Sequence, residues 1–172
     1  MADVKKGIIL KGIGGLYFVE TADAVFECKA RGIFRKSGQK PLVGDEVDIL
    51  IGEDGANNTI EEIYPRRSEL MRPPVANLDR LFILSSVRDP NPSTLIIDKM
   101  TAIACWKNIE PVIVITKDDL GDTSELRGIY EKAGIPFFSV SSRDVRGADE
   151  VKAMLSGHIS AFAGNTLSLI HI

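Results

Sequence analysis

Residues 112–120 read VIVITKDDL, an apolar run that stops at a lysine and two aspartates. A run of β-branched residues predicts a strand that is buried on both faces of a parallel sheet. The end of a strand has no structural need for the fixed spacing of Lys117 and Asp119. The stretch therefore predicts both an α/β fold around it and a group that reads a ligand at the end of the strand.

The segments around this stretch alternate between strand and helix patterns. Such alternation predicts a parallel sheet with helices on both faces, and ligands bind such sheets at the carboxyl ends of the strands. The stretch TKDD lies at one of these ends. The predicted strands are 80–87, 111–116, 136–140 and 159–164, and the predicted helices are 93–108, 123–134 and 147–157.

The first predicted helix, 93–108, carries apolar residues at helical spacing. The apolar residues at helical spacing are Leu95, Ile96, Met100, Ile103 and Ala104. We expect them to face the core together with Trp106.

Before residue 70 the pattern is different, because short β-rich runs alternate with glycine. Five short strands with turn signals between them predict a small β barrel over residues 1–68, of the oligonucleotide/oligosaccharide-binding (OB) fold. An SH3-like barrel is the structural alternative. The adjacent prolines Pro73 and Pro74 predict an extended connector over 69–76, and the α/β region then covers 77–172.

The composition is that of a soluble globular protein, with 172 residues, 44% hydrophobic and 26% charged. No apolar run approaches the roughly 20 residues of a membrane span, so we expect a cytoplasmic protein without a membrane partner. The net charge of −3 gives no global signal for nucleic acid. Cys28 and Cys105 are predicted to be reduced core thiols. His158 and His171 have no partner at a catalytic spacing and receive no role.

Asp119 is the candidate reader of the ligand. Guanine presents two parallel donors on one edge, N1–H and the exocyclic amino group, and a carboxylate accepts both, whereas adenine lacks this pair. Lys117 can lay its aliphatic stem along the purine face. At the end of the next strand, Ser141 and Ser142 can present a backbone N–H to guanine O6. Taken alone, TKDD is also compatible with a solvated charge cluster at a strand end.

These residues carry a family resemblance. VITKDDL followed by SVSS resembles the guanine-specificity motifs of GTPases, usually Asn-Lys-x-Asp and Ser-Ala. No GxxxxGK[ST] phosphate loop precedes them, so the order is that of a circular permutation. A barrel, then RPPVANLDRLFI, then a permuted domain resembles the ribosome small-subunit-dependent GTPase family, known as RsgA or YjeQ. CKARGIFRK, PLVGDEVDI and LIIDKM extend the resemblance to most of the chain.

The resemblance implies an OB-fold barrel followed by a circularly permuted P-loop GTPase domain with a parallel sheet. It also implies GTP and GDP binding with Mg²⁺, GTP hydrolysis stimulated by the small ribosomal subunit, and a role in late maturation of that subunit. In this family a zinc-binding domain follows the GTPase domain. The small ribosomal subunit and its rRNA are the implied partners, and we expect a monomer.

The resemblance also assigns site residues by position. Thr116, Lys117, Asp118 and Asp119 correspond to the base-recognition motif, and Ser141 and Ser142 correspond to the following turn. Gly164 stands where the phosphate loop would begin. Thr116 replaces the usual asparagine, so we expect a weaker tie to that loop.

A basic stretch of the barrel is a candidate rRNA contact. Its residues are expected to form a loop that meets rRNA phosphates, with Phe34 beside it for stacking. The alternative is a solvated loop in which Phe34 closes the barrel. The cations are Lys29, Arg31, Arg35, Lys36 and Lys40, with Arg66, Arg67 and Arg72 near the connector.

Residues 165–172, NTLSLIHI, contain no glycine and no lysine. A phosphate loop needs both. We therefore expect a C-terminally truncated fragment with a partial GTPase domain and a non-native tail over 165–172; a divergent native terminus is the alternative. As given, the chain is expected not to hydrolyse GTP at a meaningful rate. A non-catalytic OB-fold module that binds RNA or the ribosome is the alternative function.

Overall fold

The computed structural model describes residues 3–52 and 57–164, apart from the side chains of residues 35–37. The chain divides into two compact units between Asn77 and Leu78. Residues 165–172, for which the sequence predicts a non-native tail, lie outside the described residues.

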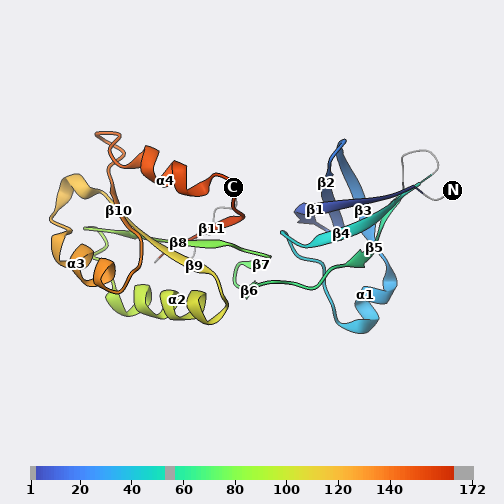
Figure 1. The fold of residues 1–172 in the computed structure, drawn as a ribbon, viewed down its shortest axis with the longest axis horizontal. Coiled ribbons are helices and arrows are strands. Elements are labelled where there is room, and N and C mark those ends of the chain that lie inside the picture. Colours follow the sequence, from blue (N-terminus) through green and yellow to red (C-terminus); the bar gives the residue numbers. More distant parts are fainter. Residues whose placement is uncertain (1–2, 53–56, 165–172) are drawn as a thin grey trace. The chain divides into compact units, whose positions relative to one another are not determined.

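The first unit contains a closed five-stranded barrel (Figure 1). Its strand order, β1-β2-β3-β5-β4, is closed because the long strand β1 pairs with both β2 and β4. The OB-type barrel predicted from the sequence is confirmed. The strands are β1 (Asp3–Ile13), β2 (Leu16–Thr21), β3 (Val25–Ala30), β4 (Glu46–Ile51) and β5 (Asn58–Ile63).

The barrel core follows from the alternation of its strands, in which every second side chain points inward. Val47 and Ile49 of β4 are fully buried, as is Val19 of β2. Cys28 also lies in this core, as predicted, and burial raises the pKa of its thiol to about 11.

The basic stretch after β3 is not a loop, as the sequence led us to expect, but contains helix α1 (Gly32–Ser37). Phe34 projects from this helix into the barrel core and is only 8% exposed. The stacking role considered for Phe34 is therefore wrong, and the alternative, in which it closes the barrel, is confirmed. The helix was not predicted because it has only six residues and no side-chain cap.

Residues 69–76, predicted as an extended connector, form a short antiparallel hairpin of β6 (Glu69–Met71) and β7 (Pro74–Ala76). An ion pair ties the chain just before this hairpin to the barrel. Asp45 is completely buried, and both of its oxygens accept from Arg66, at 2.7 and 2.8 Å. Hydrogen bonding to Asp45 raises the pKa of the Arg66 guanidinium.

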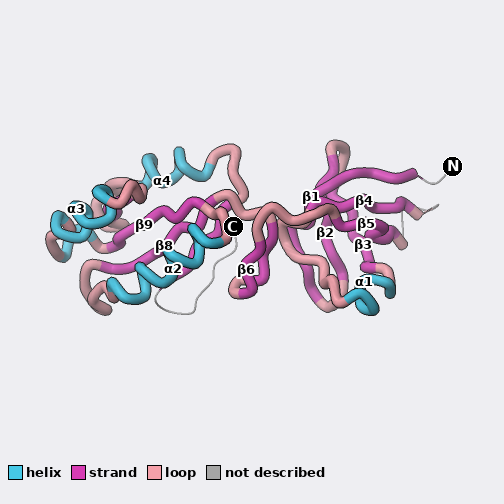
Figure 2. Tube along the Cα trace, turned by 60° about the horizontal axis from the view of Figure 1, so that its bottom comes forward, coloured by secondary structure: helices cyan, strands magenta, loops and turns pink. Residues whose placement is uncertain are grey.

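The second unit is a four-stranded parallel sheet in the order β10-β9-β8-β11. Helix α4 covers one face of the sheet, and helices α2 and α3 lie on the other (Figures 1 and 2). The predicted α/β architecture is confirmed, with element bounds within three residues of those predicted. The elements are β8 (Arg80–Ser86), α2 (Thr94–Trp106), β9 (Glu110–Thr116), α3 (Ser124–Lys132), β10 (Phe137–Val140), α4 (Ala148–Leu155) and β11 (Ser160–Gly164).

The predicted core face of α2 is largely wrong. The helix buries Ile97, Thr101 and Ala104, which are spaced by four and three residues. Of the residues expected inside, only Ala104 is buried, whereas Trp106 is 77% exposed. Cys105 is also exposed, so the prediction of a second core thiol is wrong.

Candidate functional site

The carboxyl ends of three neighbouring strands lie level with one another. Thr116, the last residue of β9, is in register with Ser86 of β8 on one side and with Val140 of β10 on the other. The segments that leave β9 and β10 therefore start side by side at one edge of the sheet. They carry the residues that the sequence predicts for base recognition.

The structure brings Asp119 and Ser141 together. The Ser141 hydroxyl donates to one carboxylate oxygen of Asp119 at 2.9 Å. The Asp119 side chain is 18% exposed, and its other oxygen lies 3.7 Å from a guanidinium nitrogen of Arg143. The Ser141 hydroxyl thus orients the carboxylate, and its other oxygen faces a solvent-exposed cation.

Asp118 faces a different partner. One of its oxygens lies 3.6 Å from the Arg146 guanidinium, which also donates to Asp144 at 3.1 Å. The backbone of Arg146 pairs with that of Ser141 in both directions, each N–H···O distance being 3.2 Å. The turn over 141–146 is therefore closed on itself and tied to the segment after β9.

Lys117 and Thr116 are bound to the end of β8. Lys117 has a left-handed backbone, with φ of 59°, and its ammonium donates to the carbonyls of Arg88 and Asp89. The Thr116 hydroxyl donates to the carbonyl of Ser85 at 3.2 Å. In this structure the threonine thus ties neighbouring strands together.

The remaining predicted residues are placed more loosely. Ser142 is exposed and follows Ser141 in the turn. Gly164 is the last residue of β11 and pairs with Leu84 of β8, so it lies at the same edge of the sheet, with β8 between it and β9.

Sequence reasoning missed the two arginines of the turn. Arg143 and Arg146 contact neighbouring aspartates, but the sequence shows only two basic residues in SSRDVRG. Such a spacing is common on solvated turns, so it carries no usable signal. A further carboxylate, Asp122, accepts from the hydroxyl and the backbone N–H of Ser124, which lowers the pKa of Asp122.

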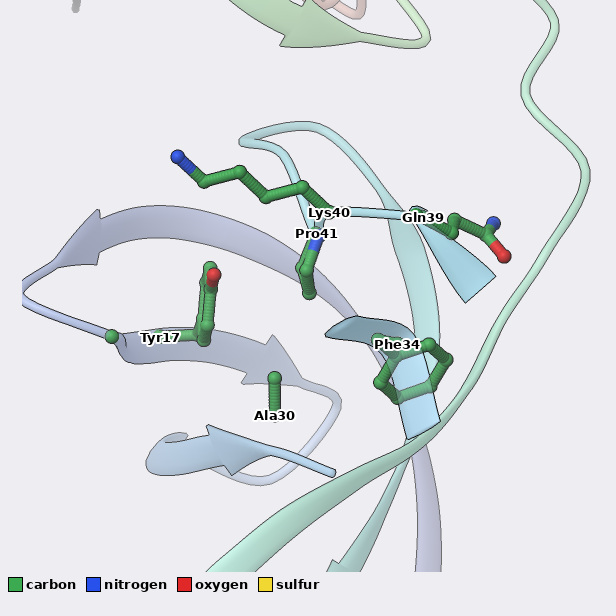
Figure 3. A pocket seen from close by; sticks show the side chains of 8 residues that line it. Tyr17, Ala30, Phe34, Gln39, Lys40 and Pro41 are labelled. Carbon is green, nitrogen blue, oxygen red and sulfur yellow. The ribbon is translucent and has the colours of Figure 1, made fainter. Parts of the chain in front are cut away.

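A second candidate surface lies on the barrel, where a hollow of about 380 Å³ opens beside α1 (Figure 3). Tyr17 and Phe34 supply its aromatic wall, and Gln39 and Lys40 lie at its rim. Lys29 and Arg31 are exposed nearby in the chain, although Arg31 forms an ion pair with Glu61. The hollow thus combines aromatic and basic character.

Across residues 3–52 and 57–164, no three His, Cys, Asp or Glu side chains come together in a way that could hold a metal ion. In the same part of the chain, every helix is too short or too polar to cross a membrane.

The fold defines a class: an OB-type barrel followed by a parallel α/β sheet, with the residues predicted for base recognition at the carboxyl ends of its strands. Two family models match the chain, the RsgA N-terminal domain over residues 6–57 and the RsgA GTPase over residues 63–166. The chain belongs to the RsgA GTPase family.

Individual relatives agree with this assignment. The small ribosomal subunit biogenesis GTPase RsgA of Alkaliphilus metalliredigens is 42% identical over 94% of this chain and 56% of its own length. The protein of the same name from Ruminiclostridium cellulolyticum is 43% identical over 93% of this chain and 54% of its own. The chain spans just over half the length of these relatives.

Two solved structures are similar across most of the chain. YloQ, described as a circularly permuted GTPase, superposes with a TM-score of 0.82 and 30% identity, over 95% of this chain and 61% of that one. YjeQ from Thermotoga maritima gives a TM-score of 0.82 and 32% identity over the same shares. The circularly permuted arrangement implied by the sequence resemblance is confirmed.

Proposed function

We propose that the carboxyl edge of the parallel sheet recognises guanine nucleotide. The observation that carries this proposal is the Asp119 carboxylate, which Ser141 holds by a 2.9 Å hydrogen bond beside the end of β10. A carboxylate oriented in this way accepts guanine N1–H and the exocyclic amino group together.

The neighbouring residues take complementary roles. The backbone N–H of Ser141 already donates to Arg146, so Ser142 is the better candidate donor to guanine O6. The Lys117 ammonium is held by the carbonyls of Arg88 and Asp89, which leaves the aliphatic stem of Lys117 to pack along the purine face. Asp118 faces Arg146, which the turn holds in place, so Asp119 is the better candidate reader of the base.

For the whole protein we infer GTP binding and hydrolysis, with Mg²⁺, in small ribosomal subunit biogenesis. Family membership and the names of the relatives support this inference. Mg²⁺ would neutralise phosphate charge. We also infer that the protein acts as a monomer in the cytoplasm and that Gly164 leads into the phosphate-binding segment.

The test of base recognition uses this chain and nucleoside monophosphates, because contacts to the base are the ones at issue. Heteronuclear NMR titration resolves millimolar affinities and reports them residue by residue. GMP is expected to shift the amides of residues 117–120 and 141–146 in a saturable way, and AMP is not. Equal shifts with both nucleotides would reject the proposed site.

We further propose that the barrel contacts rRNA of the small subunit. The basic residues beside the hollow in Figure 3 support this role, because Lys40 lines the hollow and cations bind phosphates. This property alone would make the chain an OB-fold RNA-binding module without nucleotide chemistry.

The barrel contact is tested with Lys29→Glu and Lys40→Glu, because both side chains are exposed. Both substitutions are expected to weaken binding to isolated small subunits and to reduce its salt dependence. Lys132→Glu, at the end of α3, is the matched control and should have no effect. If all three variants bind alike, the barrel surface is not the contact.

A further inference from the structure

Arg143 lies where the edge of a guanine base would have to bind. Its guanidinium is 3.7 Å from the Asp119 oxygen that Ser141 does not hold, and its side chain is 78% exposed. Ser141 keeps the carboxylate oriented, and a cation from the neighbouring turn lies beside the second oxygen.

The chemistry of the two groups is closely matched. An arginine side chain carries N–H donors on a planar N–C–N fork, which is the geometry that carboxylates accept best. The Watson–Crick edge of guanine presents the same pattern, N1–H and the amino group on either side of C2. Adenine does not, because its N1 is an acceptor and its C2 has no amino group.

We propose that Arg143 is an internal mimic of the guanine edge, which lies against the free oxygen of Asp119 and must leave before the base can bind. The proposal rests on guanine recognition by Asp119, as set out above. Arg143 is free to leave because most of its side chain is in solvent. By contrast, Arg146 is held by Asp144 and by its backbone pairing with Ser141, so it stays in place.

The ion pair between Arg143 and Asp119 lowers the affinity for guanine by about its own strength, because the base must break the pair to bind. Exposed ion pairs are weak, so removing the competitor should strengthen GMP binding about two- to five-fold at low ionic strength. Salt screens the same pair, so the gain should shrink as ionic strength rises.

The experiment compares GMP dissociation constants by NMR titration for the wild type, Arg143→Gln, Arg143→Lys and the control Lys132→Gln. Arg143→Gln should bind GMP more tightly, with the gain lost at high salt, while Lys132→Gln matches the wild type. Arg143→Lys keeps the charge without the fork and should also bind more tightly than the wild type. Wild-type affinity in Arg143→Lys would show that charge alone acts and would overturn the mimicry.

Two further outcomes separate the possible failures. If Arg143→Gln weakens GMP binding or leaves it unchanged, Arg143 is a ligand or a bystander, and the proposal fails while guanine recognition stands. If the wild type does not prefer GMP over AMP, the proposed function itself fails.

Discussion

Ser141 and Asp119 are 22 residues apart in sequence, yet the serine hydroxyl donates to the aspartate carboxylate at 2.9 Å. The contact exists because β9 and β10 are parallel neighbours, so their carboxyl ends meet at one edge of the sheet. Ser141 is almost completely buried, which fixes its hydroxyl and, through it, the plane of Asp119.

Removing the Ser141 hydroxyl should therefore leave the Asp119 carboxylate in the site but less firmly oriented. Ser141→Ala is expected to weaken GMP binding about three- to ten-fold, which lies within the range of about 0.5–1.5 kcal/mol for one ordinary hydrogen bond. Ser142→Ala is the matched control, because the proposed donor at that position is the backbone N–H. NMR titration gives both affinities. Equal losses in the two variants would contradict the assigned roles.

The turn that carries Ser141 depends on Gly147. This glycine has φ of +75°, and a Cβ at that position would lie 2.3 Å from the carbonyl oxygen of Ser139. Gly157 has nearly the same φ, +74°, but nothing lies within 4 Å of its Cβ position. Gly157→Ala should cost about 1–2 kcal/mol for the backbone conformation alone.

Gly147→Ala should cost more than Gly157→Ala, because the backbone must shift, and it should also weaken GMP binding. Urea unfolding monitored by hydrogen exchange of the sheet amides measures the stability of each variant. Matching stabilities for the two variants would show that the turn adapts freely.

The buried pair of Asp45 and Arg66 should dominate the stability of the first unit. Arg66→Met leaves a fully buried carboxylate without its partner, which is expected to cost about 3–5 kcal/mol. Lys6→Met breaks an exposed 3.0 Å pair with Glu46 and should cost far less than Arg66→Met. Hydrogen exchange of the barrel amides reports both values. A small loss in Arg66→Met would mean that water reaches Asp45.

Cys28 should make the barrel sensitive to alkaline pH. Burial raises the pKa of its thiol from 9.0 to about 11, so the folded state holds the proton more tightly than the unfolded state. The resulting stability is complete below pH 9 and is lost as the pH rises towards 11. Cys28→Ala should flatten this decline, and the exposed Cys105→Ala should not. The free energy of unfolding in urea is measured at a series of pH values. The same decline with pH in the two variants would refute the prediction.

The sequence predicted the elements of the sheet well, because the buried part of a parallel strand, such as residues 111–115 of β9, is apolar throughout and is bounded by polar residues. It failed for α2, where apolar residues occur on more than one side of the helix and periodicity gives no unique phase. Thr101 is buried there and Trp106 is not, which only the packing against β8 and β9 decides. Trp106→Ala should accordingly cost little stability.

The candidate site was only partly predictable. The TKDD and SVSS stretches indicated Asp119 and Ser141, because carboxylates and small residues at strand ends have a recognisable chemistry. The roles of Arg143 and Arg146 depend on how the turn over 141–146 folds back onto the segment after β9. That contact joins segments that are more than 20 residues apart, so local sequence patterns do not predict it.

The central claim, that Asp119 reads the Watson–Crick edge of guanine, is tested most directly by Asp119→Asn. An asparagine amide donates where the carboxylate accepted, so it suits xanthine, which has a carbonyl in place of the guanine amino group. NMR titrations of the wild type and the variant with GMP and xanthosine monophosphate should show a preference for GMP in the wild type and for the xanthine nucleotide in the variant. An unchanged preference for GMP in Asp119→Asn would contradict the account.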